Sequence, residues 1–389
     1  GTYTNTDSSA FGVDFQLGSS ITLIDTSAGT ITGDYEVKEY TLPKLDPTAG
    51  IIWDTSRLFS TGAIYVIADL IGDPSRIANT MVAAAGTTGT FGRLGMQQLD
   101  APRLNGTNVW AQAYASCQDR NSTDGRNGFD SNATGFAVGV DQQLKKMPLI
   151  IGAALGTSNG TVKPNRGTAT YTAGKIDQDG MQLGLYGRYT VNTAEEENAL
   201  LIDGYLTYGS YENDSYRTSY TTGKAATASW DEDAWAMGVT VSRNYKFREH
   251  TFITPYAGLE YTTADMHNFT ERSNGSVSYS ERDAYRNLAA IIGVSANRSF
   301  GLSNGQTVTP YANVSLSQDI MRQDAKVTAY GASDTITDES AHQGRTALQF
   351  SVGANWQIDK NWSINAGYSI ETREDAVDQN ANIGASYAF

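Results

Sequence analysis

The stretch NWSINAGYSIE, residues 361–371, alternates between apolar and polar side chains. One face carries Trp362, Ile364, Ala366, Tyr368 and Ile370, and the other carries Asn361, Ser363, Asn365, Gly367, Ser369 and Glu371. Successive side chains of a β-strand point to opposite sides of the sheet, so this period of two predicts a strand with one apolar face and one polar face.

The same alternation recurs from about residue 105 to the end of the sequence. It predicts twelve strands, at roughly 108–117, 131–142, 148–158, 177–190, 198–211, 231–245, 250–263, 285–298, 306–318, 346–358, 361–372 and 379–389. The last of these, NANIGASYAF, places Ala381, Ile383, Ala385, Tyr387 and Phe389 on one face. An even number of antiparallel strands closes a sheet into a barrel without leaving an exposed edge.

The residue types on the polar face distinguish two architectures. A soluble sandwich covers its outer face with Lys, Glu, Arg and Thr, whereas here the polar face consists mainly of Gly, Ser, Asn and Gln. Small, weakly charged side chains suit a crowded, hydrated lumen. Aromatic residues near strand ends, Tyr261, Trp356, Trp362 and Tyr387, resemble an interfacial girdle. The pattern favours an outer-membrane barrel, and a β-sandwich core is the alternative.

The connections between the predicted strands alternate in length. Short ones lie at 143–147, 245–249 and 359–360, and long polar ones lie at 118–130, 159–176, 212–230, 264–284 and 319–345. Short turns at one end and long loops at the other are typical of outer-membrane barrels, whose long loops face outward.

Composition limits the class of protein further. The 389 residues carry a net charge of −14, which disfavours a nucleic-acid partner because binding phosphates requires clustered Lys and Arg. With one cysteine, Cys117, no internal disulfide framework is expected. No apolar run approaches the roughly 18 residues of a membrane helix.

The segment 73–104 differs from the strands around it. Asp73 and Pro74 suit an N-cap and first helical position, and the apolar residues that follow favour a helix. Gly86, Gly89 and Gly92 predict a kink or an unwound stretch. Fully helical, the segment would be about 45 Å long, enough to run through an outer membrane. Its small side chains would fit a narrow pore.

Residues 1–72 form a third part of the chain. Between 19 and 66, short β-like runs are interrupted by Gly, Asp, Thr and Pro. This predicts a small β-helix-like unit, the last coils of something longer that was truncated at Gly1.

Together these parts resemble the classical monomeric autotransporters of type V secretion. The first hairpin, NVWAQAYASCQDRNSTDGRNGFDSNATGFAVGVDQQL at 108–144, is similar to that family's opening in its Trp110, Gln112, Gly135, Gly139 and Asp141. FITPYAGLEY at 252–261 resembles an internal strand of the family, and Gly384, Tyr387 and Phe389 resemble its closing signature. LPKL followed by IIWDTSRLFSTGAIYV, within 19–66, resembles a passenger end.

The resemblance implies an outer-membrane translocator with a passenger at the cell surface. The domains are then a passenger end at 1–72, a pore helix at 73–104 and a barrel at 105–389. Implied partners are outer-membrane lipid and lipopolysaccharide, periplasmic chaperones, the barrel-assembly machinery and the chain's own passenger. A monomer is expected. Gly384, Tyr387 and Phe389 would be the signal that the assembly machinery reads.

The resemblance also directs attention to the pore. Lumen residues Asp203, Glu260 and Glu371 are candidate partners for Arg76 or Arg93 of the linker. Some family members cut their own linker at an asparagine. Here Asn79 stands alone within 73–104, so an uncut linker is expected.

No catalytic, cofactor or metal site is expected from the remaining residues. His250, His267 and His342 are scattered without the spacing of a zinc site, and Cys117 has no indicated His or Asn partner. The acidic run 231–233 lacks a calcium-loop pattern and predicts a solvated rim.

Two other functions stay open at this point. One is a porin or outer-membrane channel, and the other is a surface adhesin whose barrel is only an anchor. A soluble β protein, such as a lectin-like domain, is a more distant alternative.

Overall fold

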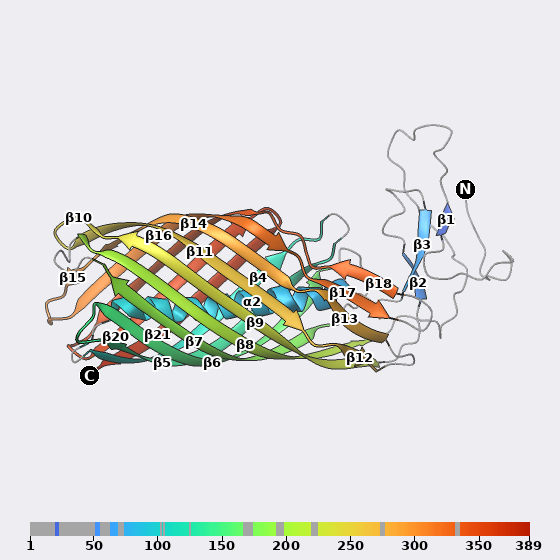
Figure 1. Ribbon diagram of the computed structural model, residues 1–389, viewed down its shortest axis with the longest axis horizontal. Helices are drawn as coiled ribbons and strands as arrows, with labels where there is room; N and C mark the ends of the chain where they lie inside the picture. The colour runs from blue at the N-terminus through green and yellow to red at the C-terminus, as the bar shows by residue number, and fades with distance from the viewer. Residues whose placement is uncertain are drawn as a thin grey trace, which may run out of the picture.

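Twelve long antiparallel strands close into a barrel with one helix inside it (Figure 1). The computed structural model describes residues 20–22, 51–54, 63–68, 74–101, 103, 106–123, 126–165, 174–191, 198–218, 225–272, 277–330 and 335–389. The barrel strands are β4 (Thr107–Arg120), β5 (Gly128–Gln143), β6 (Leu149–Asn165), β7 (Ile176–Thr190), β8 (Leu200–Thr218), β9 (Ala225–Arg243), β11 (Thr251–Met266), β14 (Tyr285–Arg298), β16 (Thr307–Gln323), β19 (Thr346–Gln357), β20 (Trp362–Arg373) and β21 (Ala376–Ala388).

Each barrel strand pairs with its neighbours in sequence, and the last pairs with the first. The β21–β4 register runs from Ala376 opposite Arg120 to Ala388 opposite Asn108. The backbone N–H of Phe389 then donates to the carbonyl of Thr107 at 3.1 Å. The predicted barrel with closure of its last strand against its first is therefore confirmed.

Several strands extend further than the alternation indicated. Strand β8 continues to Thr218 and β9 begins at Ala225, whereas the predicted strands stopped at 211 and started at 231. The additional residues lie at the long-loop end. An apolar face is needed only where a strand meets lipid, so strand extensions beyond that zone carry no clear apolar alternation.

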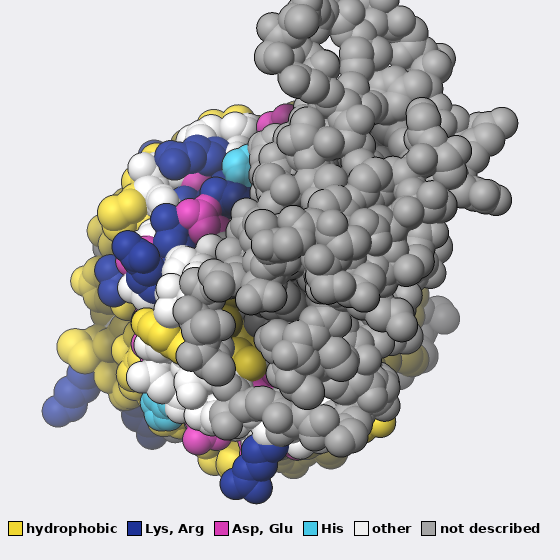
Figure 2. Space-filling view, turned by 90° about the vertical axis from the view of Figure 1, so that its right-hand side faces the viewer, with side chains coloured by type: hydrophobic (Ala, Val, Ile, Leu, Met, Phe, Trp, Pro, Cys, Tyr) yellow, Lys and Arg dark blue, Asp and Glu magenta, His cyan; other side chains and the backbone are white. Residues whose placement is uncertain are grey.

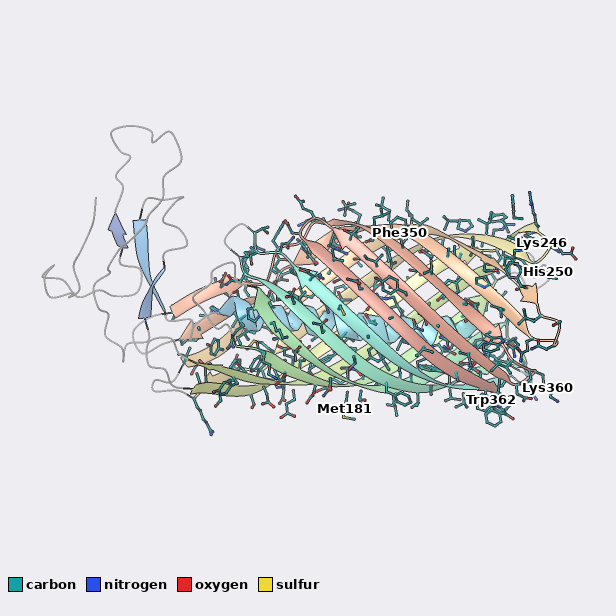
Figure 3. The ribbon with its side chains drawn as sticks, turned by 180° about the vertical axis from the view of Figure 1, so that it is seen from behind. Met181, Lys246, His250, Phe350, Lys360 and Trp362 are labelled. Carbon is teal, nitrogen blue, oxygen red and sulfur yellow. The ribbon has the colours of Figure 1, made fainter. Side chains whose placement is uncertain are left out.

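The two faces of the wall differ as the sequence predicts. Leu155, Ile292 and Ile383 point outward with about three fifths of their surface exposed, at 60%, 61% and 59%. Met181, Phe350 and Trp362 also project from the outside (Figure 3). Inward neighbours such as Trp110 are buried. This apolar outer face and polar inner face are the arrangement of a membrane barrel.

The long-loop end carries a small sheet of its own. Strands β12 (Phe269–Glu271), β13 (Val277–Asp283), β17 (Lys326–Tyr330) and β18 (Thr335–Glu339) pair antiparallel in that order. Phe269 of β12 stacks on Tyr279 of β13 and on Trp230 of β9, with ring centroids 4.8 and 4.4 Å apart. The sequence predicts loops for these segments, because their strands are too short and polar for a periodic signal. Charged side chains of both signs gather at this end (Figure 2).

The opposite end has short turns. Strands β10 (Tyr245–Arg248) and β15 (Phe300–Gly301) extend the wall there, and His250 turns the chain with φ 59°. In the turn before β20, Asp359 accepts hydrogen bonds from the backbone N–H groups of Trp362 and Asn361, at 2.7 and 2.8 Å. These bonds lower the pKa of the Asp359 carboxyl.

Helix α2 (Pro74–Gln97) runs along the inside of the barrel, and the short 3₁₀ turn η3 (Gln98–Asp100) follows it (Figure 1). Two apolar clusters surround it. One includes Ile77 and Met81 near the long loops, and the other includes Phe91 and Leu94 near the short turns. Among the described residues, no helix is both long and apolar enough to span a membrane.

Within residues 1–72 the structure describes three short strands, β1 (Ser20–Thr22), β2 (Ile51–Asp54) and β3 (Ala63–Ala68). They pair antiparallel in the order β1–β3–β2. Coils of a parallel β-helix stack their strands in parallel. The described pairing therefore differs from the predicted β-helix-like coils, and the rest of that prediction lies outside the described residues.

Candidate functional site

The helix lies off-centre in the lumen. Its backbone packs against β7, β8, β9 and β11. On the opposite side only side chains reach the wall. Thr90 donates to Asn380 at 2.9 Å, and Gln97 exchanges hydrogen bonds with Asn382. A cavity of about 760 Å³ lies on this side, lined largely by Asn, Ser, Gln and Tyr side chains.

Glycine allows the helix to approach the wall closely. A Cβ atom on Gly92 would lie 2.5 Å from the ring of Tyr205, and one on Gly86 would lie 2.5 Å from Nε2 of Gln118. At either position a Cβ atom would require the facing side chain, Tyr205 or Gln118, to move. The expected unwound stretch was wrong: α2 is continuous from Pro74 to Gln97. Burial of the helix against the barrel wall outweighs the helix penalty of about 1 kcal/mol for each glycine.

The start of the helix is held by buried polar contacts. The side-chain amide of Asn79 donates to the carbonyl of Asn127 at 3.0 Å, and its oxygen accepts from the N–H of Ala341 at 2.7 Å. The hydroxyl of Thr80 donates to the carboxylate of Glu232. Asn79 thus bridges two loops at the long-loop end of the barrel.

Glu232 corrects the prediction of a solvated acidic rim. Its side chain is 0% exposed and also accepts from the indole N–H of Trp230 at 3.0 Å and from Gln178 at 3.2 Å. The reason is strand parity, because the middle residue of the run 231–233 faces the lumen and its two neighbours face outward.

The end of the helix is clamped by a second buried network. Arg103, just after η3, pairs through Nε with Asp141 of β5 at 2.5 Å. Its Nη atoms donate to the carbonyls of Gln98, at 2.7 Å, and Leu99, at 3.1 Å, so it also caps the turn that ends the helix. Asp141 is buried, at 1% exposed.

Aromatic residues complete this clamp. The hydroxyl of Tyr186 donates to Asp141 at 2.9 Å and accepts from the indole N–H of Trp110 at 2.6 Å. Trp110 fits over Gly139, where an added Cβ would lie 2.4 Å from the indole ring. Three residues of the first-hairpin motif, Trp110, Gly139 and Asp141, therefore act together to hold the linker.

The three candidate lumen carboxylates, Asp203, Glu260 and Glu371, differ in whether they pair with the linker or with an arginine of the barrel wall. Nη1 of Arg93 lies 2.6 Å from Glu260, so the structure brings this pair together. Asp203 instead pairs with Arg188 of β7, at 2.7 Å, and Arg188 also reaches Asp100.

Two further predicted residues are placed differently. Glu371 pairs with Arg373 two residues along its own strand, at 2.5 Å. Arg76 lies 3.9 Å from Glu271, in strand β12 of the small sheet at the long-loop end, and not beside one of the predicted carboxylates. Barrel arginines pair with two of the three carboxylates, and the period of two alone did not show which arginine lies at the level of each carboxylate.

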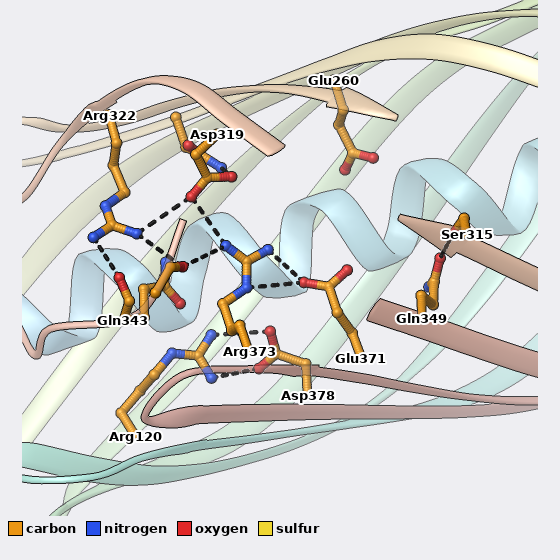
Figure 4. A network of polar contacts seen from close by, with 12 residues as sticks. Arg120, Glu260, Ser315, Asp319, Arg322, Gln343, Gln349, Glu371, Arg373 and Asp378 are labelled. Atoms are coloured by element: carbon orange, nitrogen blue, oxygen red, sulfur yellow. Dashed lines mark hydrogen bonds and ion pairs between the residues drawn. The ribbon is translucent and has the colours of Figure 1, made fainter. Parts of the chain in front are cut away.

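A cluster of ion pairs spans the wall opposite the helix (Figure 4). Arg120 binds Asp378 at 2.6 and 3.0 Å, and Arg373 contacts Asp319 at 3.0 Å. Arg322 also contacts Asp319, at 3.2 Å. The cluster links β4, β16, β20 and β21 by their lumen side. Arg120, Arg322 and Arg373 were missed in the sequence because each lies beyond the predicted end of its strand. The parity of β4 and β20 extended outward would place Arg120 and Arg373 inside, whereas Arg322 follows a register shift between Asp319 and Met321 that reverses the parity of β16.

The closing signature lies where β21 meets β4. Tyr387 packs on Trp362, with ring centroids 5.0 Å apart, and on Phe389, 4.9 Å apart, so these rings share the outer face. Gly384 faces inward, where an added Cβ would lie 2.2 Å from Gln112.

The residues considered for catalysis are dispersed. Cys117 is exposed on the outer face of β4, and His250 lies in a turn at the short-turn end. His267 lies 3.5 Å from Asp233 at the other end of the barrel. Within the described residues, no group of three or more His, Cys, Asp or Glu side chains is placed to hold a metal ion.

The Arg103–Asp141 pair is buried, whereas the Arg93–Glu260 pair is partly exposed. Removing the carboxylate should therefore destabilise the barrel more in the first pair than in the second. Asp141→Asn should lower the free energy of unfolding by about 3 kcal/mol, because it leaves the buried Arg103 charge without a carboxylate. Glu260→Gln should cost less than about 1 kcal/mol, because Arg93 is 40% exposed and water screens that pair. Urea unfolding of the purified barrel in detergent, followed by its heat-modifiable mobility, measures both. Equal losses in the two variants would contradict the clamp.

Comparison with known proteins places these features in a family. The family model for the autotransporter β-domain matches residues 109–369. The chain is 25% identical over 271 residues to the putative uncharacterized protein YaiT of Escherichia coli K12, covering 69% of this chain and 26% of YaiT. It is 26% identical over 219 residues to the probable autotransporter YpjA of the same strain, covering 55% of this chain and 13% of YpjA.

Solved structures share the fold. The translocator domain of the autotransporter NalP from Neisseria meningitidis aligns with a TM-score of 0.61 at 17% identity, over 82% of this chain and 100% of that one. The transport unit of AIDA-I from Escherichia coli aligns with a TM-score of 0.50 at 15% identity, over 80% and 99%. The chain spans about a quarter of the length of YaiT. Because the family model covers more than half of the sequence, this chain belongs to the autotransporter β-domain family.

Proposed function

We propose that this chain is an outer-membrane translocator that supports secretion and surface display of the polypeptide preceding its helix. The observation that carries the proposal is a single helix, buried along its length, inside a closed barrel. At 1.5 Å per residue its 24 residues span about 36 Å, more than the roughly 30 Å hydrocarbon core. The helix begins at Pro74 at the long-loop end, opposite the short turns (Figure 1).

The wall supports a position in the outer membrane. Its outward side chains are apolar, its lumen is polar, and its backbone is paired around the whole barrel. A membrane barrel of this family carries its long loops outward, so the long-loop end faces the cell surface and the short turns face the periplasm. The division into a passenger end at 1–72, a linker at 73–104 and a barrel at 105–389 belongs to the same proposal.

The proposal includes the partners that the family implies. Outer-membrane lipid and lipopolysaccharide surround the barrel, and periplasmic chaperones and the barrel-assembly machinery deliver it. The barrel functions as a monomer, since its sheet is closed without a second copy. The linker stays uncut, which is supported by Asn79: both ends of its side-chain amide are engaged by other parts of the chain and are held away from its own backbone.

Labelling of intact cells tests display. In a Cys117→Ser background, Ser8→Cys should react with a membrane-impermeant maleimide in intact cells, because residue 8 precedes the helix. Lys145→Cys, in a short turn, should react only after the outer membrane is permeabilised. A channel whose N-terminal segment stays in the periplasm predicts that both positions need permeabilisation, and that result would overturn the proposal.

The closing residues generate a second test. Deletion of Phe389 should lower the amount of folded barrel in cell membranes severalfold, whereas Ala388→Gly should not, because the variant keeps the backbone N–H and carbonyl through which Ala388 bonds Asn361. Both variants should refold equally well from urea into detergent, where no assembly machinery is present. If the deletion also impairs refolding in detergent, Phe389 has only a structural role.

A further inference from the structure

Three arginine–aromatic pairs lie together on the outside of the barrel at its short-turn end. The Arg243 guanidinium lies over the ring of Tyr245 at 5.3 Å, and Arg248 lies over Phe247 at 5.4 Å. The third is Arg298 over Phe300, at 5.0 Å. We call this set, with Lys246, the basic–aromatic surface.

The surface is continuous because its strands are neighbours. Strand β11 pairs with β9, which ends at Arg243, with β10, which holds Tyr245 to Arg248, and with β14, which ends at Arg298. Phe300 follows β14 directly, in β15. In register, Tyr245 lies opposite Ile253, and Ile253 lies opposite Ala296, two residues before Arg298. Lys246 and the turn residue His250 project from the same end of the barrel (Figure 3).

The aromatic rings of this surface are open to the surroundings. Tyr245 is 44% exposed, Phe247 62% and Phe300 44%. One or two steps further along the same outward rows stand Val241 and Val294, which belong to the apolar outer wall. The basic–aromatic surface therefore marks the level at which the apolar wall ends. Rings with cations beside them suit this depth, where one part of a side chain meets hydrocarbon and the other meets headgroups.

The described residues of this sector carry an excess of basic side chains. Among the described residues of this sector, Arg243, Lys246, Arg248 and Arg298 are accompanied by one acid, Glu249, so these five residues carry a formal charge of +3. Each of the three arginines lies over an uncharged aromatic ring. The arginines are thus held by aromatic faces, and their N–H groups remain free to bind an anion in the fork geometry that suits phosphate.

We propose that the basic–aromatic surface binds the phosphodiester headgroup of anionic glycerophospholipids. This goes beyond the translocator function. Only the identity of the leaflet, the periplasmic one, rests on the proposed orientation. The arginines bind the phosphate oxygens, the rings lie at the headgroup level, and Val241 and Val294 contact the upper acyl chains. Such a site fixes the depth and tilt of this side of the barrel.

Native mass spectrometry of the folded full chain in detergent micelles tests the site. Phosphatidylglycerol and phosphatidylcholine of the same chain length are added in turn, and the bound lipid is counted. The wild type should retain phosphatidylglycerol in preference to phosphatidylcholine. Arg248→Gln/Arg298→Gln should weaken phosphatidylglycerol binding by about twentyfold or more, from roughly fivefold for each basic residue at an anionic surface.

The matched control is Lys145→Gln/Lys146→Gln, which removes the same charge at the same end of the barrel from a turn without paired aromatics. It should leave the lipid preference unchanged, and inorganic phosphate should not displace the lipid. Heat-modifiable mobility verifies that every variant is folded. Equal retention of the two lipids by the wild type, or an equal loss in the control, would overturn the proposal.

Discussion

A bilayer offers no hydrogen bonds to backbone groups, and the rest of this structure depends on that constraint. Inside hydrocarbon every N–H and C=O must be paired within the protein, which permits helices and closed barrels alone. The chain meets this demand by pairing β21 with β4 along their whole length. Closure fixes the parity of every strand, and parity decides which side chains meet lipid and which face the lumen.

Closure also creates an interior that must be filled. Helix α2 satisfies its own backbone and approaches the wall through glycines such as Gly86 and Gly92. It is held at both ends, by Asn79 and Thr80 at the long-loop end and by Arg103 on Asp141 at the inner end. Between these points only one side of the helix packs tightly. The remaining space is a polar cavity with its own ion pairs on the opposite wall.

The sequence predicted the elements whose apolar and polar residues alternate, which are the barrel strands. All twelve barrel strands and their outward faces could be read because lipid requires an apolar residue at every second position. The hairpins at the long-loop end could not, since they lie beyond the lipid and their strands are short. The predicted unwound stretch in the helix was wrong because glycine propensity takes no account of a wall packed against the helix. The lumen pairs required knowing which arginines share a level, as Arg188 does with Asp203, and that depends on register.

A disulfide between helix and wall tests the threaded helix most directly. A Cβ on Gly89 would lie 3.8 Å from Cγ2 of Thr262, so cysteines at these two positions are placed to form a disulfide. In a Cys117→Ser background, oxidation of whole cells should convert Gly89→Cys/Thr262→Cys to a species of faster mobility in non-reducing denaturing gels. Gly89→Cys/Gly301→Cys should not react, since nothing lies within 4 Å of a Cβ at Gly301. A folded Gly89→Cys/Thr262→Cys barrel with both thiols free would contradict a helix held in the lumen.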